Sequence, residues 1–370
     1  MYTLSLEVIN KCNLNCTYCY LGKKKNRCMS IDTAQKAVEI GIHEAKKQYD
    51  KQLIVYFIGG EPLLAFKTIK EIVSYVKARC GEESLNYKFS ITTNGVSLTE
   101  DIVNFFTENK FDIKISLDGK MKIHDLNRKD YSGNGSFQKI IDNLNLLYNY
   151  QISTGNPISF AHVITQNNYQ YFSESFQYLL DLGCERIETG IDYYCEWMQE
   201  ELEALRDQIV KTFYSYKHHI QKNKKNVFWN VFDDHLKLYL VKCDFYACKA
   251  GLNNIFVASD GNIYTCGELP EFLIGNVHNG LSVSKIREIA YTRDIVNEKC
   301  KDCKYLKNCA ARGCLATNFE IHKDIYQPVE ASCLLTKTIF ELIEKNIDEE
   351  QLTNMRKEYQ RRSYEKQSTT

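Results

Sequence analysis

The sequence lacks the features of an exported or membrane-bound chain. Its first ten residues, MYTLSLEVIN, contain no basic stretch followed by a long apolar run, as a secretory signal would. No segment approaches the roughly 18 consecutive apolar residues of a membrane span. Net charge is also missing, because 47 Lys and Arg residues balance 47 Asp and Glu residues. We therefore expect a cytoplasmic protein with no nucleic-acid or membrane partner.

Proline is scarce, with four residues in 370, and no flexible linker separates the parts of the chain. The length exceeds that of a usual single core, so one large and one smaller domain are expected. The composition, 44% hydrophobic and 25% charged, is that of an ordinary globular protein. We expect a barrel over residues 1–195, a helical connecting segment over 196–240, a cysteine-rich unit over 241–335, and a C-terminal helix with a charged, frayed tail over 336–370.

Short β-branched runs alternate with amphipathic stretches in the first half of the chain. This pattern is typical of a parallel sheet covered by helices, the α/β class. Ser30 is a suitable N-cap for one such helix. Six repeats in about 190 residues favour a partial (β/α)6 barrel, with chemistry at the C-terminal ends of its strands. The expected strands cover residues 3–9, 53–58, 87–93, 111–117, 158–165 and 186–191.

Cysteine is abundant, with 15 residues, and without a secretory signal this indicates metal binding or catalysis rather than disulfides. Cys12, Cys16 and Cys19 follow the first expected strand in the string CNLNCTYCY. An iron–sulfur cluster used only for electron transfer normally takes four cysteines, and structural zinc also takes four ligands. Three cysteines therefore indicate a cluster with one open position, and a zinc knuckle with a distant fourth ligand is the alternative.

The C-x3-C-x2-C spacing, with the aromatic Tyr20 after the third cysteine, resembles the signature of radical S-adenosylmethionine (SAM) enzymes. The resemblance implies a [4Fe-4S] cluster whose open iron binds SAM. It also implies that one electron from the cluster splits SAM into methionine and a 5′-deoxyadenosyl radical. Such a protein would be oxygen-sensitive.

Polar motifs at three further strand ends fit a SAM site. The string Gly59-Gly60-Glu61-Pro62 resembles the GGEP motif that holds the SAM amino group: glycines permit close backbone approach to a ligand and a carboxylate can accept hydrogen bonds from an ammonium group. The string SLDG…HDLNR, which contains His124, resembles the corresponding segment of radical SAM peptide and sulfatase maturases. Asn94, in Thr93-Asn94-Gly95 at the end of the third expected strand, is a further candidate SAM ligand. Ser116 and Arg128 are candidates suited to the SAM carboxylate or ribose.

Eight more cysteines lie between residues 243 and 333, enough for two fully ligated four-iron clusters. Together with the hairpin-like string NIFVASDGNIYTC, they are similar to the SPASM extension of radical SAM maturases. A pair of zinc ribbons is the alternative. The resemblance implies a first auxiliary cluster on Cys243, Cys248, Cys266 and Cys314, and a second on Cys300, Cys303, Cys309 and Cys333.

One departure from the SPASM pattern is that CAARGC places four residues, not three, between Cys309 and Cys314. This puts the role of Cys314 in doubt. Four cysteines stay unassigned and are expected to be inert small hydrophobes, although Cys195 is expected near the barrel mouth. They are Cys28, Cys80, Cys184 and Cys195.

The resemblance implies a peptide or protein substrate, three [4Fe-4S] clusters with SAM, and an electron donor such as flavodoxin or ferredoxin. Sulfatase-maturing members carry an Asp directly after the cysteine of G-x4-C, where this chain has Gly267 followed by Glu268. We therefore expect peptide crosslinking, through a thioether or another bond, ahead of formylglycine formation, with Glu268 as the candidate catalytic carboxylate.

Many peptide-crosslinking members begin with a leader-binding winged domain, for which no room exists before Cys12. We therefore expect leader recognition by a separate protein or by the barrel surface. A non-catalytic iron–sulfur or zinc scaffold is the alternative from another functional class.

Overall fold

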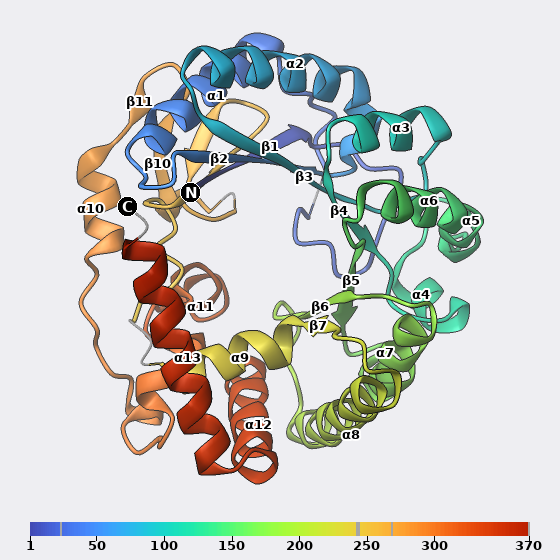
Figure 1. Cartoon of the computed structure of the whole chain (residues 1–370), viewed down its shortest axis with the longest axis vertical. Coiled ribbons are helices and arrows are strands. Elements are labelled where there is room, and N and C mark those ends of the chain that lie inside the picture. The colour runs from blue at the N-terminus through green and yellow to red at the C-terminus, as the bar shows by residue number, and fades with distance from the viewer. Residues whose placement is uncertain (23, 242–244, 268, 369–370) are drawn as a thin grey trace.

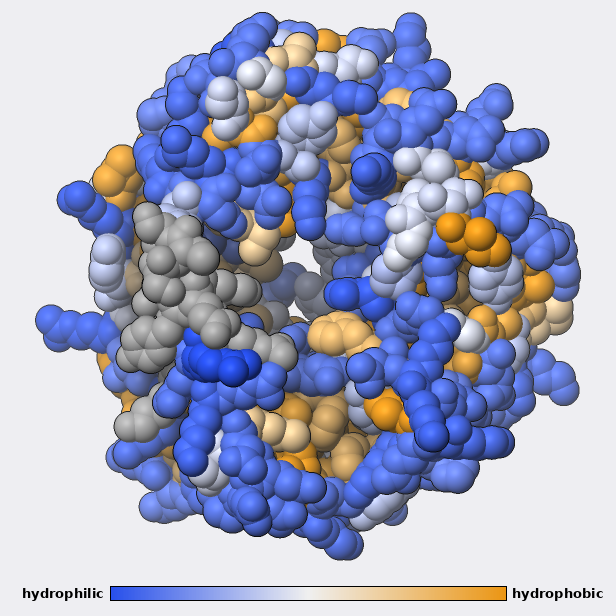
Figure 2. Space-filling view, viewed as in Figure 1, coloured by the Kyte–Doolittle hydropathy of each residue, from blue (hydrophilic) through white to orange (hydrophobic). Residues whose placement is uncertain are grey.

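One curved sheet runs through the chain (Figure 1). The computed structural model describes residues 1–368 except 23, 242–244 and 268, and describes side chains up to residue 361. In this part of the chain the sheet has eleven strands in the order β11-β10-β9-β8-β1-β2-β3-β4-β5-β6-β7. The sheet curls around the middle of the molecule, which is hollowed in the space-filling view (Figure 2).

The parallel half of the sheet contains the six strands expected from sequence, which confirms the α/β prediction. Adjacent strands from β1 to β6 pair in parallel and in chain order, as successive βα units do. The strands are β1 (Tyr2–Ile9), β2 (Gln52–Gly59), β3 (Asn86–Thr93), β4 (Asp112–Ser116), β5 (Ser159–Ile164) and β6 (Arg186–Ile191).

Helices cover the outer face of the parallel strands (Figure 1). As expected, Ser30 caps the first helix, because its side chain accepts a hydrogen bond from the Thr33 amide at 3.0 Å. The helices are α1 (Ile31–Lys46), α2 (Phe66–Glu82), α3 (Glu100–Glu108), α4 (Met121–Asn127), α5 (Phe137–Asp142), α6 (Leu144–Thr154), α7 (Phe172–Asp181) and α8 (Gln199–Asn223). None of the described helices is long and apolar enough to cross a membrane.

A short strand lies within the segment expected to be purely helical. Strand β7 (Phe228–Trp229) pairs with β6 and leads into α9 (Asn230–Leu240). Trp229 is fully buried, and its indole N–H donates to Thr189 Oγ1 at 3.0 Å. Two residues are too few to show a strand period in the sequence, so packing of the Trp229 ring fixes this strand.

The sheet continues from the parallel half into the cysteine-rich part of the chain. Strand β8 (Asn254–Val257) pairs in parallel with β1, and β9 (Asn262–Tyr264) completes the expected hairpin. Strands β10 (Leu273–Asn276) and β11 (Gly280–Leu281) extend the sheet in antiparallel fashion. Buried Glu7 at the end of β1 accepts a hydrogen bond from the Ser259 amide at 2.9 Å. The hairpin is thus anchored directly to the first barrel strand.

Helices complete the ring of the molecule on the side away from the parallel strands (Figure 1). They are α10 (Val283–Ala290), α11 (Leu315–His322), α12 (Glu330–Asn346) and α13 (Glu349–Ser368). The expected C-terminal helix is therefore α12, which begins earlier than expected and buries Ile339, Phe340 and Ile343. The charged tail expected to fray is helical as far as Ser368.

Candidate active site

A cavity of about 540 Å³ lies at the C-terminal ends of the parallel strands. Such strand ends carry the chemistry in α/β barrels. All ten residues that the sequence indicated for the first cluster and for SAM line this cavity. They are Cys12, Cys16, Cys19, Tyr20, Gly59, Gly60, Glu61, Asn94, Ser116 and Arg128.

The three N-terminal cysteines share one wall of this cavity. Cys12 is 8% exposed, and its sulfur accepts the Leu14 amide at 3.3 Å and the Asn94 side-chain amide at 3.7 Å. Burial raises the pKa of both Cys12 and Cys16. Three thiols that line one cavity could serve as the donor set of a cluster with one free position.

Gly59 and Gly60 hold the end of β2 against the cysteine loop. The amides of Gly60 and Glu61 each donate at 2.8 Å, to the carbonyls of Ile9 and Lys11 respectively. A Cβ on Gly59 would lie 2.2 Å from the Ile9 carbonyl oxygen, and one on Gly60 would lie 2.2 Å from that of Lys11. We expected these glycines to allow close approach of a ligand. Both glycines line the cavity. The group that approaches each of them most closely, however, is not a ligand but a backbone carbonyl of this chain, at Ile9 and at Lys11.

Glu61 is fixed in the cavity wall by three hydrogen bonds. Its carboxylate accepts from Thr93 Oγ1 at 2.6 Å, from the Asn94 amide at 2.7 Å and from the Leu63 amide at 3.0 Å. Burial raises the pKa of Glu61, and these hydrogen bonds oppose that effect. No ion pair of Glu61 is found among the described residues, and an immobilised, buried carboxylate of this kind is well suited to bind an ammonium group.

Arg128 provides the complementary positive charge. It donates to the Tyr18 hydroxyl, which in turn donates to Asp118 Oδ2 at 2.7 Å. Its Nε is buried and has no hydrogen-bond partner among the described residues. Because an unpaired buried donor is costly, this nitrogen indicates a ligand acceptor such as a carboxylate. Ser116, at the end of β4, lines the same cavity.

His124 lies behind the site rather than in it. Its Nδ1 accepts the Asp118 amide at 3.2 Å, and its Nε2 lies 2.9 Å from Ser136 Oγ. Burial lowers the pKa of His124 to about 2, so the ring is neutral. It therefore braces the loop that leads from Ser116 to Arg128.

Sequence reasoning missed several polar residues that line the cavity. Lys114 Nζ and Glu188 Oε2 form an ion pair at 2.5 Å between β4 and β6, and Asp192 follows β6. Lys114 lies two residues before Ser116 on β4, so strand alternation could have placed it on the same face. Tyr194 also lines the cavity.

A second cavity, of about 520 Å³, connects this site with the cysteine-rich part of the chain. It shares Tyr20, Leu21, Ile58 and Tyr194 with the first cavity and extends to Cys266. Glu320 of α11 lines it and accepts a hydrogen bond from the Tyr194 hydroxyl at 3.0 Å. The two cavities therefore adjoin each other, and we call the pair, which extends from the three-cysteine loop to Cys266, the passage.

Three of the cysteines expected to hold the first auxiliary cluster lie close together. We call Cys248, Cys266 and Cys314 the first auxiliary site. Burial, together with the nearby thiols of Cys314 and Cys248, raises the pKa of Cys266 to about 11. Two residues expected in this region, Cys243 and Glu268, lie outside the described residues.

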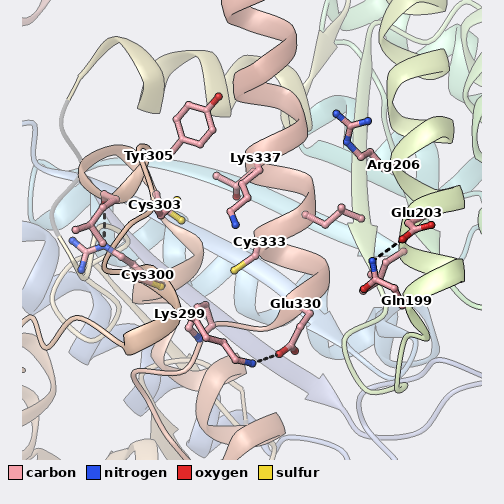
Figure 3. A pocket seen from close by; sticks show the side chains of 17 residues that line it. Gln199, Glu203, Arg206, Lys299, Cys300, Cys303, Tyr305, Glu330, Cys333 and Lys337 are labelled. Carbon is pink, nitrogen blue, oxygen red and sulfur yellow. Dashed lines mark hydrogen bonds and ion pairs between the residues drawn. The ribbon is translucent and has the colours of Figure 1, made fainter.

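The four cysteines expected to hold the second auxiliary cluster line one cavity of about 400 Å³. We call Cys300, Cys303, Cys309 and Cys333 the second auxiliary site. Figure 3 shows the sulfurs of Cys300, Cys303 and Cys333 facing the same space. Burial, with Cys309 and Cys300 nearby, raises the pKa of Cys333 to about 12. Within the described ranges, no three His, Cys, Asp or Glu side chains are grouped closely enough for a single metal ion.

None of the four unassigned cysteines lines these cavities. Cys80 and Cys184 are buried in the core, and Cys28 is exposed. Cys195 donates weakly to the Asp192 carbonyl at 3.5 Å but lines none of the three cavities.

Known proteins resemble this chain at the level of both sequence and fold. The chain is 27% identical to a cysteine-type anaerobic sulfatase-maturating enzyme of Clostridium novyi, over 82% of this chain and 85% of that protein. It is 22% identical to the radical SAM cyclopropyl synthase TigE of Paramaledivibacter caminithermalis, over 93% and 75%. The solved structure of native anSMEcpe with bound AdoMet matches 96% of this chain and 99% of that chain, with a TM-score of 0.76 and 22% identity.

The family comparison covers the part of the chain that carries the three-cysteine loop and its cavity. Residues 6–179 match the model of the radical SAM superfamily. This range begins in β1 and ends in α7. The chain therefore contains a radical SAM domain over these residues, and its relatives of known function are enzymes.

Proposed function

We propose that this chain is a radical SAM enzyme that modifies a peptide through two auxiliary clusters of a SPASM region. The observation that carries the proposal is the passage from the three-cysteine loop to Cys266. A peptide segment in that passage would lie between a SAM molecule and an auxiliary cluster.

The residues of the first cavity suit a cluster and SAM. Cys12, Cys16 and Cys19 would hold the cluster, Glu61 the SAM ammonium and Arg128 the SAM carboxylate. Bound SAM, reduced by the cluster, supplies a 5′-deoxyadenosyl radical that abstracts hydrogen. The further candidate SAM contacts are Tyr20, Gly59, Gly60, Asn94 and Ser116. The surrounding strands would position the substrate C–H bond and exclude water.

The eight C-terminal cysteines would hold two further [4Fe-4S] clusters, three in all. The grouping of the first and second auxiliary sites in separate places supports this ligation. Clusters with four protein ligands cannot bind substrate, so they would carry the electron released after hydrogen abstraction. A flavodoxin or ferredoxin is the proposed electron donor.

Loss of two hydrogens from a peptide removes one hydrogen atom, one proton and one electron. The hydrogen atom would leave as 5′-deoxyadenosine and the electron would pass to an auxiliary cluster. The proton needs a base, and Glu320 is the described carboxylate that lines the passage beside Cys266. Glu268, the candidate from sequence, is a second proposal for this role.

We propose that the product is a crosslink, most simply a bond from a cysteine sulfur to carbon. Gly267 in place of the expected Asp supports crosslinking over formylglycine formation. The similarity to a cysteine-type sulfatase-maturating enzyme keeps formylglycine formation as the second candidate. A separate leader-binding protein is a proposed partner for either reaction.

Product mass separates the two reactions. The anaerobically reconstituted enzyme, with SAM and dithionite, would be incubated with cysteine-containing peptides, including the precursor encoded nearest to this chain. A loss of two hydrogens with sulfur retained supports crosslinking. Conversion of cysteine to an aldehyde, with sulfur lost, supports sulfatase maturation. A colourless zinc protein that forms no 5′-deoxyadenosine would contradict both reactions and would favour the alternative that the chain is a non-catalytic scaffold.

A further inference from the structure

Arg312 is a buried cation beside the second auxiliary site. It lines the same cavity as the four cysteines of that site, and its side chain is 8% exposed. The other charged residues that line this cavity are at the surface. Arg206 and Lys299, for example, form exposed ion pairs with Glu341 and Glu330. Water and salt screen such exposed charges. Among the described charged residues that line the cavity, which include the exposed Lys337, Arg312 is therefore the least screened.

The Arg312 guanidinium is held in one position. Its Nε donates to the Leu306 carbonyl at 3.0 Å, and its Nη2 donates to Asp294 Oδ2 at 2.8 Å. A second donor, Nη1, also bonds Asp294. Its carbon lies 5.3 Å from the centre of the Phe245 ring. Asp294 is 43% exposed, so solvent weakens its compensation of the buried charge.

Arg312 lies in the segment between Cys309 and Cys314 that is one residue longer than the SPASM pattern. Residues Ala311–Gly313 form a single 3-10 turn between the two cysteines. A Cβ on Gly313 would lie 1.4 Å from the Phe245 carbonyl oxygen, so this end of the turn packs directly on backbone. The turn thus presents Arg312 to the second auxiliary site while its last residue leads into Cys314 of the first.

We propose that Arg312 raises the reduction potential of the cluster at the second auxiliary site, and that Asp294 limits this effect. The proposal rests on the presence of that cluster, as proposed above. When the cluster takes up one electron it gains one negative charge, which a nearby buried cation stabilises. Net charge and surroundings of this kind are established determinants of cluster potentials.

The test is a redox titration followed by electron paramagnetic resonance. It uses the full chain with Cys12, Cys16 and Cys19 changed to Ala, so that only auxiliary clusters contribute. Arg312→Met should lower the reduction potential of one of the two auxiliary clusters. At a fixed applied potential, the ratio of reduced to oxidised cluster should fall about tenfold, which corresponds to a shift of about 59 mV for a one-electron couple. Asp294→Asn should raise the same potential, because it removes one compensating charge and keeps the cation.

Two comparisons separate an electrostatic from a structural role. Arg312→Lys keeps the charge and should restore most of the potential lost in Arg312→Met. Arg356→Met removes an arginine that pairs with exposed Glu349 and should leave both potentials unchanged. Equal potentials in all variants, or shifts of the same sign in Arg312→Met and Asp294→Asn, would overturn the proposal.

Iron content distinguishes failure of the inference from failure of the proposed function. If Arg312→Met loses its cluster, the sign of the shift in Asp294→Asn decides the question. If the chain with only Cys12, Cys16 and Cys19 changed to Ala gives no electron paramagnetic resonance signal of an auxiliary cluster, the proposed function and this inference are overturned together. Normal clusters with insensitive potentials would overturn the inference alone.

Discussion

Individual residues of the candidate active site are held from behind by residues that do not reach the cavity. Asp118 is fully buried and bonds the Tyr18 hydroxyl and the Val163 amide, while His124 bonds the Asp118 amide. Arg128 is in turn anchored through Tyr18. The motif SLDG…HDLNR therefore combines cavity-lining residues with residues that position them.

Removal of the Arg128 charge should weaken SAM binding. We expect Arg128→Met to raise the Kd for SAM at least tenfold, because its buried Nε is a cationic donor without a hydrogen-bond partner among the described residues. Arg128→Lys should not restore affinity, since lysine lacks the planar fork. The Kd is measured from the change that added SAM causes in the electron paramagnetic resonance spectrum of the reduced N-terminal cluster. Arg27→Met, at an exposed pair with Asp260, is the control, and equal affinities in the two variants would argue against a role for Arg128.

His124 should make the fold sensitive to acid. Its pKa of about 2 in the fold lies below the ordinary value of 6.5, so folding favours the neutral ring. This contribution is complete above about pH 6.5 and is lost as pH falls. Between pH 6.5 and 5 it should decrease the free energy of unfolding by about 2 kcal/mol.

The His124 prediction is checked by urea unfolding followed by tryptophan fluorescence, since Trp229 is fully buried. Between pH 6.5 and 5, the free energy of unfolding of His124→Asn should decrease by about 2 kcal/mol less than that of the unaltered chain. His219→Asn changes a histidine on α8 and should keep the full dependence. Identical pH slopes in all three proteins would contradict the role assigned to His124.

At the scale of elements, the end of β2 and the cysteine loop act as one unit because glycine permits their contact. Gly60→Ala should separate them, since its Cβ would lie 2.2 Å from the Lys11 carbonyl oxygen. We expect iron content to fall from about twelve to about eight atoms per chain as only the N-terminal cluster is lost.

Gly81→Ala is the matched control for Gly60→Ala. Its Cβ would meet no atom within 4 Å, and it should keep all the iron. Iron analysis after anaerobic reconstitution gives the comparison. Full iron content in Gly60→Ala would show that the loop tolerates displacement.

The sequence predicted elements whose signal is local and missed those fixed by distant packing. The six barrel strands follow from β-branched runs, and the Ser30 cap from a residue next to its helix. Strand β7 depends on the burial of Trp229 against Phe176, with ring centres 4.8 Å apart, and no local period marks it. The parallel pairing of β8 with β1 joins residues some 250 positions apart, which no local pattern can indicate.

The candidate site shows the same division between local and distant information. Motifs at strand ends brought ten expected residues to one cavity. The pair Lys114–Glu188 and the contact of Tyr194 with Glu320 depend on which strands and helices become neighbours. Such contacts appear only when the chain is folded.

At the scale of the whole molecule, the continuous sheet makes the two halves of the chain depend on each other. A fragment of residues 1–240 would lack β8 and expose the edge of β1, an apolar strand with an unpaired backbone. We expect this fragment to accumulate in the insoluble fraction when the full chain does not. Recovery of the fragment in the supernatant, with the fluorescence of a buried Trp229, would show that the barrel folds alone.

The most direct test of the central claim is anaerobic reconstitution of the full chain with iron and sulfide. The account predicts a brown protein with about twelve iron atoms per chain. It also predicts formation of 5′-deoxyadenosine when SAM and dithionite are added, and loss of that activity when Cys12, Cys16 and Cys19 are changed to Ala. A colourless protein that binds zinc and leaves SAM intact would contradict the account.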